Sequence, residues 1–96
     1  MILKRLIKIK NSQGLHARPA SLFVKIAIKY NSEVTVRKGA DAVNGKSIMG
    51  LMTLAANQGS TIEIEVNGED AQSAMAELEE FLKADREEEK KKGSSK

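Results

Sequence analysis

His16 is the side chain whose type and surroundings best suit nucleophilic chemistry in this sequence. It is the only histidine, and it lies two residues after Gly14 and three residues before Pro19. Because the fixed φ of proline suits the first turn of a helix, this spacing predicts that His16 lies where a helix begins. Backbone N–H groups and the positive end of the helix dipole meet at such a start, so the sequence predicts a site for an anion.

Arg18 and the imidazole of His16 together indicate which anion this site would bind and what reaction it would undergo. A neutral imidazole has a lone pair that attacks phosphorus, and the guanidinium of Arg18 matches the oxygens of a phosphate. A single histidine is more often structural, and a surface Arg often has only a capping role, so these residues alone indicate an anion site with a nucleophile. No Walker-type loop and no metal-binding carboxylate pair accompanies them. We therefore interpret the protein as a phosphoryl carrier with a phosphohistidine intermediate rather than a free-standing enzyme.

The composition argues against several other kinds of site. Without cysteine there are no disulfides, thiol nucleophiles or thiolate metal sites, and one histidine cannot form a histidine cluster for a metal. A net charge of +3 with one Tyr, two Phe and no Trp gives little support for direct nucleic-acid binding. The sequence contains no apolar run long enough to cross a membrane and no leader pattern. We expect a cytoplasmic protein that needs no metal or cofactor.

Hydrophobic periodicity predicts the elements that position the site. Alternation of apolar residues indicates half-buried strands, and spacing of three and four residues indicates amphipathic helices. Ser47 and Asp70 are the expected N-caps of the second and third helices, and Gly59 is the expected end of the second. In chain order the expected elements are strand 5–10, helix 19–30, strand 33–37, a short strand through Val43, helix 48–56, strand 61–66 and helix 71–82.

This order, βαββαβα, predicts an α+β domain of two layers. Because every strand alternates, one face of the sheet is expected to be solvated and the other covered by helices, which favours an antiparallel sheet. Residues 1–84 contain all of these elements and form the expected domain. Residues 85–96 form a charged tail in which Glu and Lys pairs can extend the last helix before a disordered end.

The helix after Ser47 carries more apolar residues than one buried stripe accommodates. On helical geometry they spread over roughly 220° of the helix surface. Some are therefore expected to be exposed, and exposed methionines suit a surface that docks several partners. The residues concerned are Ile48, Met49, Leu51, Met52, Leu54 and Ala55.

Two segments resemble the HPr family, the histidine-containing phosphocarriers of the bacterial phosphoenolpyruvate:sugar phosphotransferase system. They are GLHARPA at residues 14–20 and NGKSIMGLM at residues 44–52, and the resemblance extends over about residues 2–83. It implies an open-faced β-sandwich, with four antiparallel strands in the order 1-4-2-3 and three helices on one face.

The resemblance also implies roles for individual residues. His16 would accept a phosphoryl group on Nδ1 from enzyme I and pass it to enzyme IIA components, while Arg18 and the N–H groups of Ala17 and Arg18 would hold the phosphate. Ser47 would be phosphorylated by an HPr kinase/phosphorylase, and that form would act as a corepressor with a catabolite-control transcription factor. The residues that match the family's docking patch and the adjoining helix are Ala20, Phe23, Ile48, Met49 and Met52.

Two alternatives remain open at this point. The protein could be mainly a regulatory partner that acts through phosphoserine-dependent binding in catabolite or nitrogen control. A plain interaction domain is the other alternative, and it leaves residues 14–19 unexplained. A regulatory paralogue that lacks the carrier histidine is disfavoured because His16 is present. We expect a monomer that does not insert into a membrane.

Overall fold

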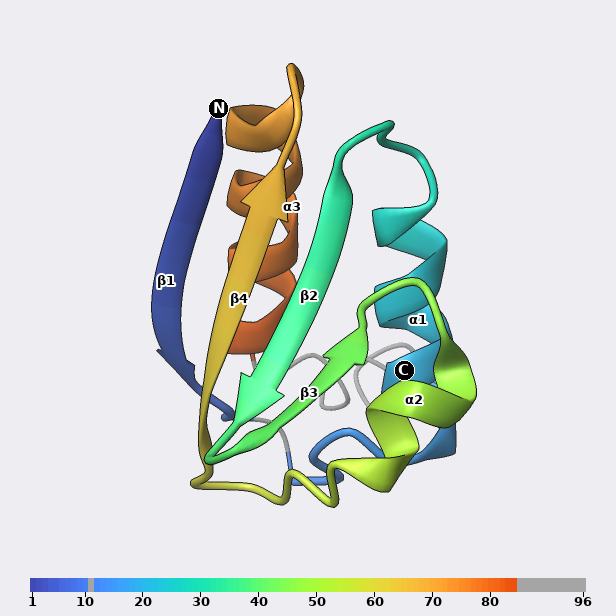
Figure 1. Cartoon of the computed structure of the whole chain (residues 1–96). Coiled ribbons are helices and arrows are strands. Elements are labelled where there is room, and N and C mark those ends of the chain that lie inside the picture. The colour runs from blue at the N-terminus through green and yellow to red at the C-terminus, as the bar shows by residue number, and fades with distance from the viewer. Residues whose placement is uncertain (11, 85–96) are drawn as a thin grey trace.

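The computed structural model describes residues 1–10 and 12–84, which form one sheet with three helices packed on one face (Figure 1). The strands are ordered β1-β4-β2-β3, and all neighbouring strands are antiparallel. The predicted class, element order and strand order are confirmed. The elements are β1 (Ile2–Lys8), α1 (Ala17–Ala27), β2 (Glu33–Lys38), β3 (Asp41–Asn44), α2 (Ile48–Thr53), β4 (Thr61–Asn67) and α3 (Ala71–Lys83).

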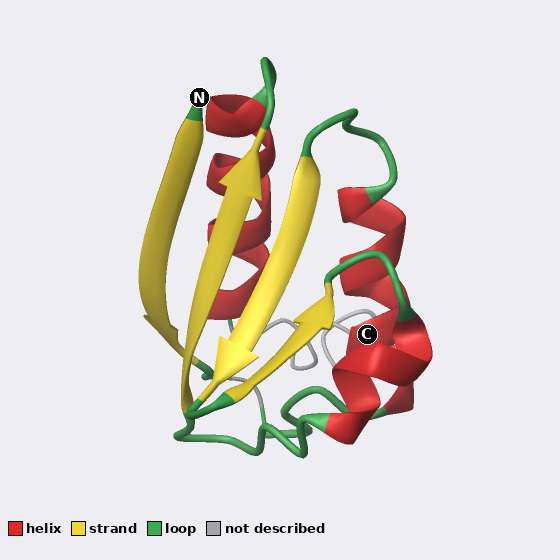
Figure 2. Ribbon diagram, in the orientation of Figure 1, coloured by secondary structure: helices red, strands yellow, loops and turns green. Residues whose placement is uncertain are grey.

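The sheet has a buried face and an open face, as the alternation predicts. In the central strand β4, Ile62, Ile64 and Val66 are buried beneath the helices. The residues between them point to the opposite face, which none of the helices in the described ranges covers (Figure 2). There Arg37 of β2 forms ion pairs with Glu63 at 3.2 Å and Glu65 at 2.6 Å. The core therefore lies on the helical side only.

The three helices close the core against the sheet. Helix α3 packs on β1 and β4, α1 packs on α2 and α3, and α2 packs on β3. The apolar stripe predicted for α3 is buried throughout: Ala71, Ala74, Met75, Leu78, Phe81 and Leu82.

The bounds of the first two elements differ from the prediction. Strand β1 covers Ile2–Lys8 rather than 5–10, because its ends follow its pairing with β4, from Ile2 opposite Asn67 to Lys8 opposite Thr61. Helix α1 starts two residues earlier than predicted, at Ala17, and ends three residues earlier, at Ala27. A partner strand far away in sequence thus sets the ends of β1.

Helix α2 is shorter than predicted, because it ends at Thr53 instead of 56. Ala55 adopts a left-handed backbone with φ +52, which takes the chain out of the helix. Gly59, expected to end the helix, lies in the following turn with φ +90, so that prediction is wrong. Because alanine favours helices, the sequence gives no sign that α2 ends before Ala55.

Asp70 takes the predicted N-cap position of α3 but makes no side-chain capping bond. Its carboxylate instead accepts the N–H of Asn31 at 2.9 Å, the N–H of Ser32 at 3.0 Å and the hydroxyl of Ser32. These bonds, the Ser32 hydroxyl first, lower the pKa of the Asp70 carboxyl below its ordinary value. The side chain therefore ties the turn after α1 to the start of α3.

The charged tail, residues 85–96, lies outside the described residues, so its helix extension and the domain boundary at 84 stay predictions. Within the described ranges, no helix is long and apolar enough to cross a membrane.

We predict that Asp70→Asn makes the free energy of unfolding less dependent on pH in the acid range. Because the folded-state pKa of Asp70 lies below its unfolded value, the stabilisation is present above the ordinary value of 3.8 and is lost as the pH falls through the folded-state pKa. Urea denaturation should show the variant less stable than the wild type at neutral pH, with a difference that shrinks in acid. Asp41→Asn, which changes an exposed carboxylate of β3, is the matched control. Parallel pH profiles for wild type and Asp70→Asn would contradict the prediction.

Candidate functional site

His16 is the N-cap residue of α1, as the sequence predicts for a helix start. Its backbone is extended, with φ −78 and ψ −171, and its carbonyl accepts the N–H of Ala20 at 2.8 Å. The side chain makes no capping hydrogen bond and is exposed. The imidazole is therefore accessible at the surface while the backbone beside it is held by the helix.

The first turn of α1 provides donors next to this imidazole. Ala17 and Arg18 open the helix, and N–H groups in these positions have no carbonyl within the helix to bond. Both residues are exposed, and the first turn contains no acidic residue. In the part of the chain that the structure describes, the guanidinium of Arg18 forms no ion pair. The start of α1 thus has the donors and the positive charge that suit an anion.

Ser47 is the N-cap of α2, which confirms the predicted capping role. Its Oγ accepts the N–H of Gly50 at 3.0 Å, and its carbonyl accepts the N–H of Leu51 at 3.0 Å. The side chain is only partly exposed. The structure therefore assigns Ser47 a local structural role at the start of α2, whatever its role in regulation.

The apolar surface of α2 is divided between core and solvent, as its sequence predicts. Leu51 and Leu54 are buried. On the outer side of the helix, Ile48 is 39% exposed, Met49 75% and Met52 41%. We call these three residues the α2 patch.

Two residues expected to form part of the docking surface lie on the adjoining helix α1 but point into the core. Ala20 and Phe23 are both fully buried in the core, so neither offers surface to a partner, and their predicted docking role does not fit the structure. They lie on the inner face of α1. Leu22, which the sequence reasoning did not select, is 41% exposed on the same helix. The sequence signal that could have identified Leu22 as exposed is its position outside the apolar stripe of α1.

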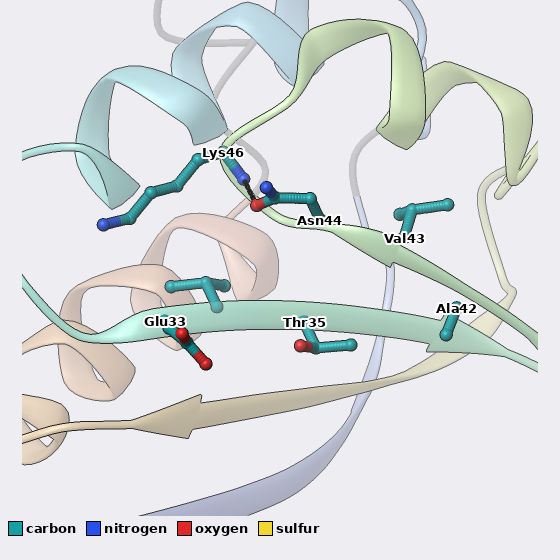
Figure 3. Close-up of a pocket in the computed structure, with 7 residues that line it drawn as sticks. Glu33, Thr35, Ala42, Val43, Asn44 and Lys46 are labelled. Carbon is teal, nitrogen blue, oxygen red and sulfur yellow. Dashed lines mark hydrogen bonds between the residues drawn. The ribbon is translucent and has the colours of Figure 1, made fainter.

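A shallow pocket of about 380 Å³ lies between β2 and β3 (Figure 3). Glu33, Thr35 and Asn44 are among the residues that line it, together with Lys46. The N–H of Lys46 donates to Oδ1 of Asn44, and its ammonium donates to the carbonyl of Tyr30, both at 2.8 Å. The pocket contains none of the predicted site residues. Among the described residues, no group of three or more His, Asp or Glu side chains is arranged to hold a metal ion.

Comparison with known proteins decides the family. The family model described as "PTS HPr component phosphorylation site" matches residues 3–84. The chain belongs to the HPr family. It is thus related to the phosphocarriers of the phosphotransferase system, as its two motifs predict.

Individual relatives match most of this chain and nearly all of their own length. The phosphocarrier protein HPr of Neisseria meningitidis serogroup A is 48% identical over 81 residues, which cover 84% of this chain and 91% of that protein. The crystal structure of HPr-C-His from Thermoanaerobacter tengcongensis superposes with a TM-score of 0.84 at 41% identity, covering 86% of this chain and 93% of the other.

A third relative is connected with catabolite repression. The crystal structure of Crh from Bacillus subtilis has a TM-score of 0.71 at 39% identity and covers 82% of this chain and 91% of that one. It is described as a catabolite repression protein and as a dimer with domain swapping. The dimeric state of this relative is in tension with the expected monomer.

We predict that Ser47→Ala lowers the free energy of unfolding by about 1 kcal/mol, the usual contribution of an N-cap side chain. The variant loses the acceptor for the N–H of Gly50. Urea denaturation measures the change. Ser73→Ala, the same replacement at an exposed position inside α3, is the matched control and should not destabilise the protein. Equal destabilisation by both variants would contradict the capping role.

Proposed function

We propose that the protein accepts a phosphoryl group from enzyme I on Nδ1 of His16 and passes it to enzyme IIA components during sugar uptake. The observation that carries this proposal is the exposed imidazole at the N-cap of α1, which makes no capping bond. It lies within the GLHARPA segment of a chain that belongs to the HPr family.

The transfer step follows from the groups at the start of α1. The lone pair of Nδ1 attacks phosphorus, the new N–P bond forms, and the bond between phosphorus and the donor atom of enzyme I breaks. The N–H groups of Ala17 and Arg18, in the first turn of α1, and the guanidinium of Arg18 would stabilise the charge on the phosphoryl oxygens. Transfer to enzyme IIA is the reverse reaction with a different acceptor.

Exposure of the site favours a carrier over an enzyme that binds a small substrate. His16, Ala17 and Arg18 are all at the surface. Two proteins that exchange a phosphoryl group must bring their reacting atoms into contact, and an acceptor on a helix end allows this. The α2 patch supports docking, because α2 packs directly against α1, the helix whose N-cap is His16.

A second proposed function is regulation through Ser47. Phosphorylation by an HPr kinase/phosphorylase would place about −1.5 to −2 charges beside Ile48 and Met49 of the α2 patch. In that form the protein would bind a catabolite-control transcription factor. The similarity to Crh, a catabolite repression protein, supports this proposal and keeps a mainly regulatory role as the alternative.

We predict that incubation with phosphoenolpyruvate and enzyme I adds one phosphoryl group to the wild type and none to His16→Ala. Intact-mass measurement detects the addition, and circular dichroism should show an unchanged fold because the side chain is exposed. Gln72→Ala, which alters an exposed residue of α3, is the control and should be phosphorylated like the wild type. Undiminished phosphorylation of His16→Ala would overturn the assignment.

We predict that Ser47→Asp weakens the complex with enzyme I by about threefold to tenfold while the free protein stays folded. The added charge must be desolvated when a partner covers the α2 patch, and it repels an acidic surface that receives Arg18. Calorimetry measures the affinity. Ser73→Asp adds the same charge on exposed α3 and should bind like the wild type. Wild-type affinity for Ser47→Asp would leave Ser47 with its capping role alone.

A further inference from the structure

The connection between α2 and β4, residues 54–60, is bonded to the segment that leads to His16 at two separate places. At one place the N–H of Leu15, the residue before His16, donates to the carbonyl of Ala56 at 2.8 Å. At the other, Ile9 exchanges backbone hydrogen bonds with Gly59 and Ser60, both at 2.9 Å. Both the α2–β4 connection and the residues just before His16 lie in the lower part of the molecule in Figure 1. We call residues 54–60 the α2–β4 connection.

The contact next to His16 is tightly packed. Gly14 has φ +62, and a Cβ at this position would lie 2.4 Å from the carbonyl oxygen of Ala56 and 2.8 Å from Cα of Asn57. Leu15 and Ala56 are each only 2% exposed. The backbone just before His16 therefore follows the α2–β4 connection closely, and a shift of one requires a shift of the other.

Two side chains hold the α2–β4 connection in place. The ammonium of Lys38, at the end of β2, donates to the carbonyl of Ala55 at 3.2 Å. The amide of Gln58 donates to the carbonyl of Lys10 at 3.1 Å. Ala55 itself has φ +52, a left-handed conformation that an alanine keeps only where surrounding contacts impose it. Lys38, which is partly exposed, contributes one of those contacts, and the exposed Gln58 ties the same connection to Lys10.

We propose that the α2–β4 connection is a positioning element for phosphoryl transfer, with Lys38 and Gln58 as positioning residues. The inference rests on the proposed function of His16. By holding Leu15, the connection fixes the backbone of the N-cap and thus the direction of the imidazole relative to the N–H groups of Ala17 and Arg18. Alignment matters because a misplacement of about 1 Å in a reacting group can cost up to about a hundredfold in rate.

The test uses the double variant Lys38→Met, Gln58→Ala in the full chain. Hydrogen exchange of the Leu15 amide should accelerate about fivefold to tenfold, because the bond to Ala56 opens more often. Exchange of the Leu78 amide in buried α3 should stay at the wild-type rate. In phosphorylation by enzyme I, kcat should fall about threefold to tenfold while KM changes less than twofold.

Two control variants separate positioning from a general loss of charge. The single variant Lys38→Arg keeps a donor for the carbonyl of Ala55 and leaves Gln58 intact. Its kcat should therefore equal that of the wild type. Lys29→Met removes a lysine that bonds Glu77 at 2.7 Å, just beyond the far end of α1 from His16. It should leave the Leu15 exchange rate and kcat at wild-type values.

Each contrary result has a distinct meaning. Wild-type kcat in the double variant overturns the positioning role while the proposed function stands. A raised KM with unchanged kcat also overturns it, because the two side chains would then contact enzyme I. Faster exchange at Leu78 by the same factor as at Leu15 would show a general loss of stability and likewise overturn the inference. A wild type that accepts no phosphoryl group overturns the proposed function first.

Discussion

Burial of the inner face of α1 is the interaction on which the site depends. Ala20, Phe23 and Ala27 are fully buried, and burial of a side chain the size of Phe contributes about 1.5–3 kcal/mol. This anchors the helix in the core against α2 and α3 while its first turn stays at the surface. His16 lies four residues before Ala20, in phase with the buried stripe, yet its extended N-cap backbone directs it away from the core. An accessible nucleophile can therefore sit on a rigid element.

The same packing separates the surface used for chemistry from the surface suited to docking. The inner face of α1 is occupied by the core, so partners must use what the packing leaves exposed. That surface includes the α2 patch and Leu22 of α1, on two helices that pack together. A phosphocarrier of the HPr family needs both parts, because its partners must bind the surface and reach the helix end.

Polar side chains at loop ends connect segments that the hydrophobic core does not join. Asp70 holds the turn after α1 through three hydrogen bonds, and Lys38 reaches the carbonyl of Ala55. Each bond is modest, since a typical net contribution is about 0.5–1.5 kcal/mol. Their effect is to restrict where loops lie, which matters most for the segment before His16.

The amino-acid sequence by itself determined the features that depend on residues close together in the chain. Alternation predicted the strands, the stripe of α3 was correct at every position, and local motifs predicted the helix start at His16 and the Ser47 cap. Only the tertiary structure decided which partners distant residues find. Asp70 bonds Ser32, 38 positions away, instead of capping its own helix, and contacts with Lys38 and Leu15 accompany the left-handed turn at Ala55. Local periodicity carries no information about such partners, because they lie close together only in the tertiary arrangement with the strand order β1-β4-β2-β3.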